Sequence, residues 1–99
     1  MTGEHEMVTQ IFLKAGCLVP KHSHVSEQIT ICMSGSMKFT IGDEEFILRP
    51  GELILIPSWV EHSAEAFEDT FEMDIFSPIR RDWLDKTDDY LRRGASPSR

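Results

Sequence analysis

Short apolar runs, interrupted at regular intervals by turn residues, make up the sequence from Met7 to Ile75. The runs are rich in Ile, Val, Leu, Phe and Thr, and Gly, Pro or Ser-Gly clusters separate them. This pattern is typical of an all-β sandwich or barrel. We therefore expect strands at residues 7–14, 27–33, 37–41, 45–48, 53–56, 62–67 and 71–76.

Turn residues between these runs predict how the strands are connected. The sequence S-G-S at 34–36 and G-D at 42–43 contain residues that tolerate a positive φ, and R-P-G-E at 49–52 is typical of a tight turn. We expect hairpins at these places, and hence an antiparallel sheet.

The run at 27–33 places two uncharged sets of side chains on opposite faces. The apolar set consists of Ile29, Ile31 and Met33. The small or neutral polar set consists of Gln28, Thr30 and Cys32. The barrel interior covers one face, and a second layer or a partner subunit must cover the other. Because a chain of 99 residues is also marginally stable alone, we expect a homodimer.

Length and charge limit the other classes of partner. The sequence allows one domain, expected over residues 1–94 with a short C-terminal α-helix at 80–93 and a flexible tail at 95–99. A net charge of −7 argues against nucleic acid and against an anionic membrane surface. The sequence has no membrane-spanning run and no signal peptide, and its two cysteines suit a reducing compartment, so we expect a cytoplasmic protein.

Three of the four histidines predict a metal site. His22 and His24 are two residues apart, so an extended segment directs both rings to one side, and His62 lies beside another expected strand. Gln28, four residues after His24, can reach the same side, whereas the odd offset of Glu27 places it on the opposite face. Taken alone, two such histidines are more often surface residues than ligands.

The spacing around these residues extends to two motifs. The segment from Gly16 to Gly35 fits G-x5-H-x-H-x3-(E/Q)-x6-G, and the segment from Gly51 to His62 fits G-x5-P-x-(G)-x2-H. This pattern resembles the two motifs of the cupin superfamily, which implies a double-stranded β-helix, or jelly-roll barrel, with a metal ion inside. The implied ligands are His22, His24, Gln28 and His62.

Some positions depart from that family pattern. Gln28 stands where most metal cupins have Glu, Trp59 stands where Gly is common, and Ala66 replaces the usual Asn. Three neutral imidazoles and an amide leave the ion its full positive charge, which favours Lewis-acid chemistry. Imidazole ligands accept Ni, Zn, Mn, Fe or Cu, so the identity of the divalent ion stays open.

The segment E-M-D-I-F-S-P-I-R-R-D-W-L, which begins at Glu72, resembles the small KdgF-type cupins of pectin and alginate degradation. These proteins help to convert 4,5-unsaturated monouronates into linear ketonised sugars. The resemblance implies that Asp74 transfers a proton, that Arg80 binds the carboxylate of a small-molecule substrate, and that Phe76 shapes the pocket.

The residues alone leave other functions open. Asp74 could face solvent and Arg80 could belong to the charged face of the expected helix. Three histidines with open coordination positions also suit a cupin oxygenase that uses Fe(II) and O2. A non-catalytic cupin that binds a small molecule is a further alternative, and a lyase acting on another carbon skeleton is a minor one.

Overall fold

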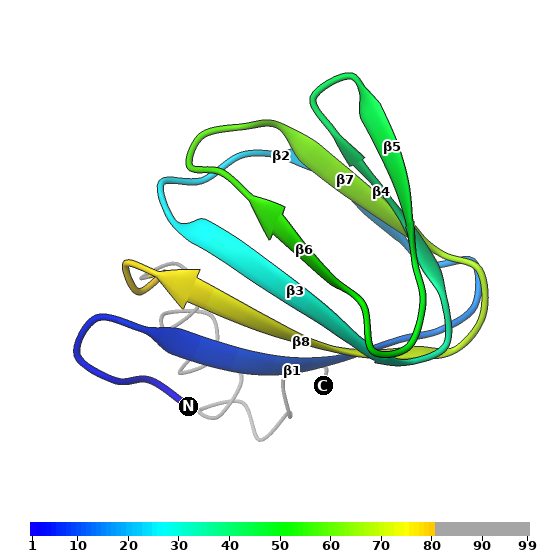
Figure 1. Cartoon of the computed structure of the whole chain (residues 1–99), viewed down its shortest axis with the longest axis horizontal. Helices are drawn as coiled ribbons and strands as arrows, with labels where there is room; N and C mark the ends of the chain where they lie inside the picture. Colours follow the sequence, from blue (N-terminus) through cyan, green and yellow to red (C-terminus); the bar gives the residue numbers. More distant parts are fainter. Residues whose placement is uncertain (81–99) are drawn as a thin grey trace, which may run out of the picture.

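The computed structural model of the chain describes residues 1–80, which form two four-stranded antiparallel sheets facing each other (Figure 1). Sheet A has the order β1-β8-β3-β6 and sheet B the order β2-β7-β4-β5. The strands of these residues are β1 (Met7–Leu13), β2 (Leu18–His22), β3 (Glu27–Ser34), β4 (Met37–Ile41), β5 (Glu44–Leu48), β6 (Leu53–Ile56), β7 (His62–Ala66) and β8 (Thr70–Ser77). The all-β jelly-roll prediction is confirmed.

Every expected strand is present, with bounds within one residue of the prediction, but β2 was not predicted. Its sequence, L-V-P-K-H, contains Pro20, which cannot donate a ladder hydrogen bond. β2 tolerates this proline because it lies at the edge of sheet B, where it pairs only with β7 among the described strands, and its register shifts between Val19 and His22.

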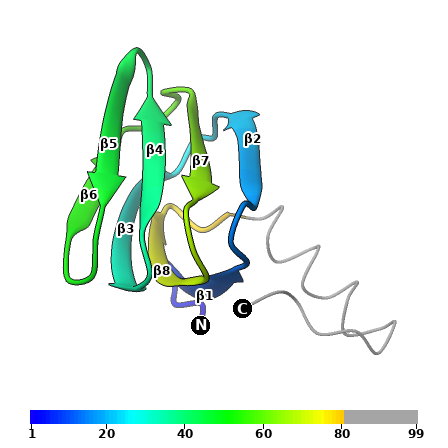
Figure 2. The same ribbon diagram turned by 90° about the vertical axis from the view of Figure 1, so that its right-hand side faces the viewer.

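The expectation of hairpins is correct at 42–43, where β4 pairs with β5, and wrong at 34–36 and 49–52. These two turns carry the chain from one sheet to the other, as Figure 2 shows. At the first of them Gly35 has φ 85°, and a Cβ there would collide with the backbone of Asp69 and Thr70. The crossover therefore requires glycine for both its conformation and its size.

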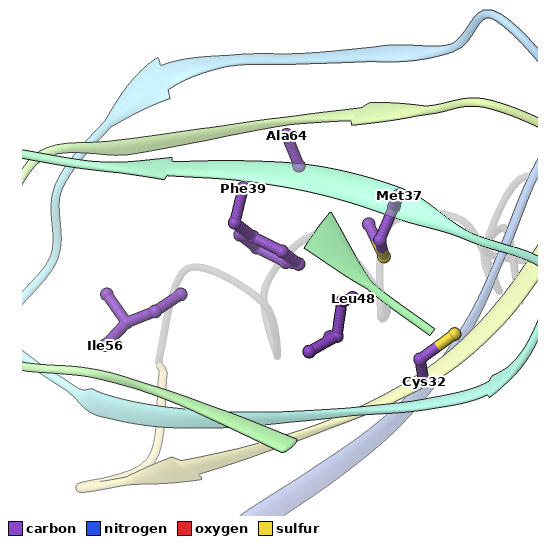
Figure 3. Packing of buried hydrophobic residues seen from close by; sticks show 6 residues of the cluster. All are labelled: Cys32, Met37, Phe39, Leu48, Ile56 and Ala64. Carbon is purple, nitrogen blue, oxygen red and sulfur yellow. The ribbon is translucent and has the colours of Figure 1, made fainter. Parts of the chain in front are cut away.

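An apolar cluster fills the space between the sheets (Figure 3). It consists of Cys32, Met37, Phe39, Leu48, Ile56 and Ala64. Cys32 is fully buried there, as expected for a residue that fills the barrel. Buried polar residues lie along β3 and β8 and also include His24 and His62, and together they define the candidate site described below.

The outer face of sheet A is mostly apolar, with the exposed Glu27 at the start of β3. In one cross-strand row Ile75 lies between Val8 and Ile29, and Leu55 follows beside Ile29. The parallel row joins Gln10, Met73, Ile31 and Leu53, and the rings of Phe12 and Phe71 stack at 4.5 Å. Leu53 and Leu55 are exposed among residues 1–80, so sheet B covers only the inner face of this sheet.

The chain leaves β8 at Ser77, and the Ser77–Pro78 peptide is cis. The expected helix at 80–93 and the tail at 95–99 fall outside the described residues, apart from Arg80. Residues 1–80 include no helix with the length and apolar character needed to span a membrane.

Candidate metal centre

The candidate metal ligands belong to the end of the barrel where β2 ends and β3 and β7 begin, at the left of Figure 1. His22 closes β2, and His62 opens β7 directly opposite it in the register of sheet B. His24 follows β2 in the loop, and Gln28 projects inward from β3 of sheet A. The three histidines offer ring nitrogens that all lie within 4.8 Å of one another.

Each of the three rings is oriented by its own backbone. The Nδ1 atom of every ring lies within hydrogen-bond distance of a carbonyl oxygen two residues away in the sequence. The partner of His22 is the carbonyl of Pro20 at 2.7 Å. His24 has the carbonyl of Ser26 at 2.8 Å, and His62 has that of Val60 at 2.9 Å. Because a carbonyl oxygen can only accept, Nδ1 must donate, and a neutral ring then keeps Nε2 as a free ligand atom.

The side chains of Gln28 and His24 approach each other in an arrangement that is unfavourable unless a cation lies between them. The Nε2 atom of Gln28 donates to Thr30 Oγ1 at 2.8 Å, which directs the amide oxygen of Gln28 toward His24 Nε2 at 3.0 Å. With Nδ1 of His24 donating to Ser26, two lone pairs face each other at that short distance. A proton on His24 or a shared metal ion would remove this repulsion.

Burial favours the metal ion over the proton. It lowers the pKa of His24, with the charge of Arg80 as a second cause, and lowers the pKa of His62 to about 4. His62 Nε2 is also buried without a hydrogen-bond partner among the described residues. Neutral imidazoles with exposed lone pairs and an amide oxygen fit a divalent transition metal ion, and these residues could hold one.

A hydrogen-bond chain connects these ligands to a buried carboxyl group. Thr30, which accepts from Gln28, donates to Asp74 Oδ1 at 2.7 Å. Asp74 projects inward from β8 opposite Thr30, and its side chain is almost completely buried. It therefore does not face solvent, and burial raises the pKa of its carboxyl group.

Phe76 and Arg80 lie at the same end of the barrel. The Phe76 ring contacts His24 edge-on, with 5.7 Å between the ring centroids. The guanidinium carbon of Arg80 lies over the same ring, 5.1 Å from the centroid of Phe76. Burial lowers the pKa of His24, and the positive charge of Arg80 adds to this effect. Burial raises the pKa of Asp74, and the same charge opposes that rise, so the cation lies within electrostatic reach of both groups.

The sequence reasoning missed Glu72. Its side chain is as buried as that of Asp74, and the two carboxyl groups are hydrogen-bonded to each other. The signal was present, because Glu72, Asp74 and Phe76 are spaced by two residues and a strand directs such residues to one face. Because glutamate is rarely buried, the alternation alone does not predict that Glu72 is an interior residue.

The family comparison identifies the fold. The family described as Cupin domain matches residues 9–77. The chain is a cupin. No curated protein matches it.

Several solved structures share this fold. KdgF from Halomonas sp. superposes with a TM-score of 0.81 at 28% identity, over 85% of this chain and 80% of that chain. An RmlC-like cupin from Shewanella frigidimarina gives 0.79 at 23%, over 83% and 74%. A variant of salicylate 1,2-dioxygenase from Pseudoaminobacter salicylatoxidans, in complex with gentisate, gives 0.72 at 19%, over 75% of this chain and 20% of that chain.

The second cupin motif keeps its backbone shape in spite of Trp59. This residue occupies the position where glycine is common, and it retains φ 63°, in the left-handed region. Its backbone N–H donates to the carbonyl of His24 at 2.9 Å, and its side chain is exposed. The turn before His62 is thus tied to the loop that carries His24.

Proposed function

We propose that this cupin is a metal-dependent enzyme that opens and ketonises an unsaturated uronate-type sugar acid. The observation that carries the proposal is the combination of groups at one end of the barrel. A three-histidine cluster, a buried carboxyl group and a cation lie there together, and they suit a polarised oxygen, a moving proton and a substrate carboxylate. The similarity to KdgF from Halomonas sp. supports the same reaction class.

His22, His24, Gln28 and His62 are the proposed ligands of a divalent transition metal ion. The ion would supply Lewis-acid polarisation of a substrate oxygen when bound. The carbonyl-oriented rings and the amide hold its ligand atoms in place before it arrives, which limits the reorganisation needed on binding.

Asp74 is the proposed proton carrier. Ring opening with ketonisation is an isomerisation in which one proton leaves a hydroxyl oxygen and one arrives at a ring carbon. A single carboxyl group can perform both transfers if it is held still and shielded from water. Thr30 orients Asp74 Oδ1 through a 2.7 Å hydrogen bond, and burial brings its pKa closer to neutrality, which suits both transfers.

Arg80 is the proposed binding group for the substrate carboxylate, and Phe76 supports it. The guanidinium plane can form paired hydrogen bonds with a carboxylate. The face of the Phe76 ring stabilises the cation at 5.1 Å, and its edge packs against His24. Phe76 therefore sets the spacing between the carboxylate-binding group and the proposed ion.

The decisive experiment uses metal-reconstituted protein and 4,5-unsaturated galacturonate or its alginate counterpart. Loss of the enol absorbance and consumption of oxygen are followed together, with and without air. We expect loss faster than the spontaneous rate and independent of oxygen. Asp74→Asn should abolish the acceleration, whereas Asp43→Asn, in the exposed 42–43 turn, should not change it.

Arg80→Ala tests the substrate class. It should leave the metal content unchanged and raise KM about 10- to 100-fold, as expected when a charge-assisted hydrogen bond is lost. Oxygen consumption coupled to substrate loss would instead indicate the oxygenase function. Full metal occupancy with no acceleration on either uronate would indicate a binding function.

We further propose that the protein is a cytoplasmic homodimer that pairs through the outer face of sheet A. The free cysteines support a reducing compartment. The two cross-strand rows of this face carry no charged side chain, which lowers the repulsion between two copies of a chain with net charge −7. The same face on both copies satisfies the self-complementarity of a twofold interface.

A further inference from the structure

The interior of the barrel contains a second carboxyl group that the reaction proposed above does not use. Glu72 lies on β8 two residues before Asp74, and its side chain is 4% exposed. It lies deeper in the barrel than Asp74, farther from the histidines. The register with β3 shows this, since Asp74 pairs with Thr30, next to Gln28 on the inner face, whereas Glu72 pairs with Cys32. A buried carboxyl group at this depth needs a physical explanation.

The contact between the two carboxyl groups requires a proton. Their side chains are hydrogen-bonded to each other, yet two carboxylates offer only acceptors. Thr30 already donates to Asp74 Oδ1, so the hydroxyl group does not supply the missing donor between the acids. One of the two acids must therefore be protonated and donate to the other.

The neighbours of each group indicate which acid holds that proton. Asp74 is flanked across the sheet by Thr9 on β1 and Thr30 on β3, and the Thr30 hydroxyl donates to Asp74 Oδ1. Hydroxyl groups stabilise a carboxylate.

Glu72 has the opposite surroundings. It is flanked by Ile11 on β1 and by the thiol of Cys32 on β3, and Cys32 directs its weak hydrogen bonds to the carbonyls of Ser34 and Gly35. Its Oε2 atom has no partner among the described residues. An apolar environment favours the neutral form of a carboxylic acid.

The Arg80 cation strengthens this asymmetry. Burial raises the pKa of both acids, but the charge of Arg80 opposes the rise at Asp74, whereas the neighbouring Asp74 adds to the rise at Glu72. Two adjacent titratable groups in unlike surroundings divide into an acid and a base.

We infer that Glu72 is a positioning residue that holds the shared proton and donates it to Asp74, so that Asp74 enters the reaction as an oriented, ionised proton acceptor. This assignment rests on the proposed function for its catalytic meaning, but the state of the pair is independent of any substrate. It completes a buried sequence of hydrogen bonds from Gln28 through Thr30 and Asp74 to Glu72.

Infrared spectroscopy of the metal-loaded protein at neutral pH tests the assignment without substrate. We expect a carboxylic-acid C=O band that shifts in D2O. Glu72→Gln should remove the band, whereas the exposed-residue control Glu44→Gln should retain it. Absence of the band from the wild type, or its persistence in Glu72→Gln, would overturn the inference.

Asp74→Asn provides a second variant if Glu72→Gln does not fold. The acid band should remain in Asp74→Asn, because Glu72 stays buried and can donate to the new amide oxygen. Loss of the band in this variant would assign the proton to Asp74 and contradict the inference.

The uronate assay then tests whether the proton positions Asp74. Glu72→Leu removes the donor and should lower kcat about tenfold with little change in KM, the effect of one lost hydrogen bond. Glu72→Gln, whose amide can still donate, should recover most of that loss. Equal kcat in the leucine variant and the wild type would refute the positioning role. An inactive wild type that shows the acid band would refute the proposed reaction alone.

Discussion

His62 and its two partners show how little sequence is needed to preset a ligand set. In each case the ring is held by a carbonyl only two residues away, so the orientation is encoded locally. The two-residue spacing of His22 and His24 therefore indicates that both rings share one side, without reference to any long-range contact. The fold contributes the register that places His62 opposite His22.

Replacing His62 should weaken metal binding. Loss of a group that only hydrogen-bonds to a metal ligand typically reduces metal affinity about 10- to 100-fold, and loss of a ligand should cost at least as much. We expect His62→Ala to retain the fold and to bind the ion at least about tenfold more weakly in a chelator competition assay. His5→Ala is the control, because the His5 side chain is 82% exposed and lies 3.6 Å from the carboxyl group of Glu4 on the surface. Equal affinity in the two variants would contradict the three-histidine site.

At the scale of single residues, Glu72 shows what the sequence does not predict. The sequence indicates which face of β8 a residue occupies, but not that the deep end of this face accepts a carboxyl group. That depends on the neighbouring Asp74, Thr30 and Ile11, which come from three different strands. Only the assembled sheet brings these groups together.

Among the elements, β8 carries proposed site residues on one face and apolar residues on the other. Its inner row carries Glu72, Asp74 and Phe76, while its outer row carries Phe71, Met73 and Ile75. This alternation was predictable, as were the bounds of the long strands, because both follow from the period of two. The sheet to which each strand belongs was not, since a turn sequence does not specify whether the chain returns to its own sheet or crosses to the opposite one.

The buried acid on β8 makes stability depend on pH. Burial raises the pKa of Glu72 above its usual range, with the neighbouring Asp74 as a second cause, so the folded protein keeps a proton that the unfolded chain releases above about pH 5. Because the unfolded state binds fewer protons, this group makes the free energy of unfolding fall as the pH rises. Glu72→Gln cannot titrate, so its loss of stability from about pH 5 to pH 8 should be smaller.

Urea titrations of both proteins across that range provide the measurement. The other titratable groups near the pair, Asp74, Cys32 and Arg80, are present in both, so the comparison tests the contribution of Glu72. A stability loss as steep in the variant as in the wild type would contradict the prediction.

The crossover between β3 and β4 should be sensitive to a single methyl group. Gly35→Ala places a Cβ against the backbone of Asp69 and Thr70 at a positive φ, so we expect a loss of more than about 2 kcal/mol in the free energy of unfolding. Gly42→Ala, in the β4–β5 hairpin, has a positive φ but open space, and should cost about 1 kcal/mol. Equal losses would show that the close approach at Gly35 is unimportant.

For the whole molecule, the outer face of sheet A predicts the oligomeric state. Leu53 on β6 and Leu18 on β2 are similarly exposed, at 63% and 66%, but only Leu53 belongs to that face. We expect Leu53→Lys to shift the protein from dimer to monomer in light scattering, because a buried charge would oppose the interface. Leu18→Lys should remain dimeric. A monomeric wild type would contradict the proposed pairing and indicate that this face is covered otherwise.

The proposed ligands come from both layers of the barrel: His22 and His62 belong to sheet B, and Gln28 belongs to sheet A. An ion bound among them would cross-link two sheets that are otherwise joined at this end by loops and side-chain packing. Part of its binding free energy would then be folding free energy. Each tenfold rise in free metal concentration above the dissociation constant would stabilise the fold by about 1.4 kcal/mol. The free metal concentration would thereby affect how long the protein stays folded, as well as how fast the proposed enzyme turns over substrate.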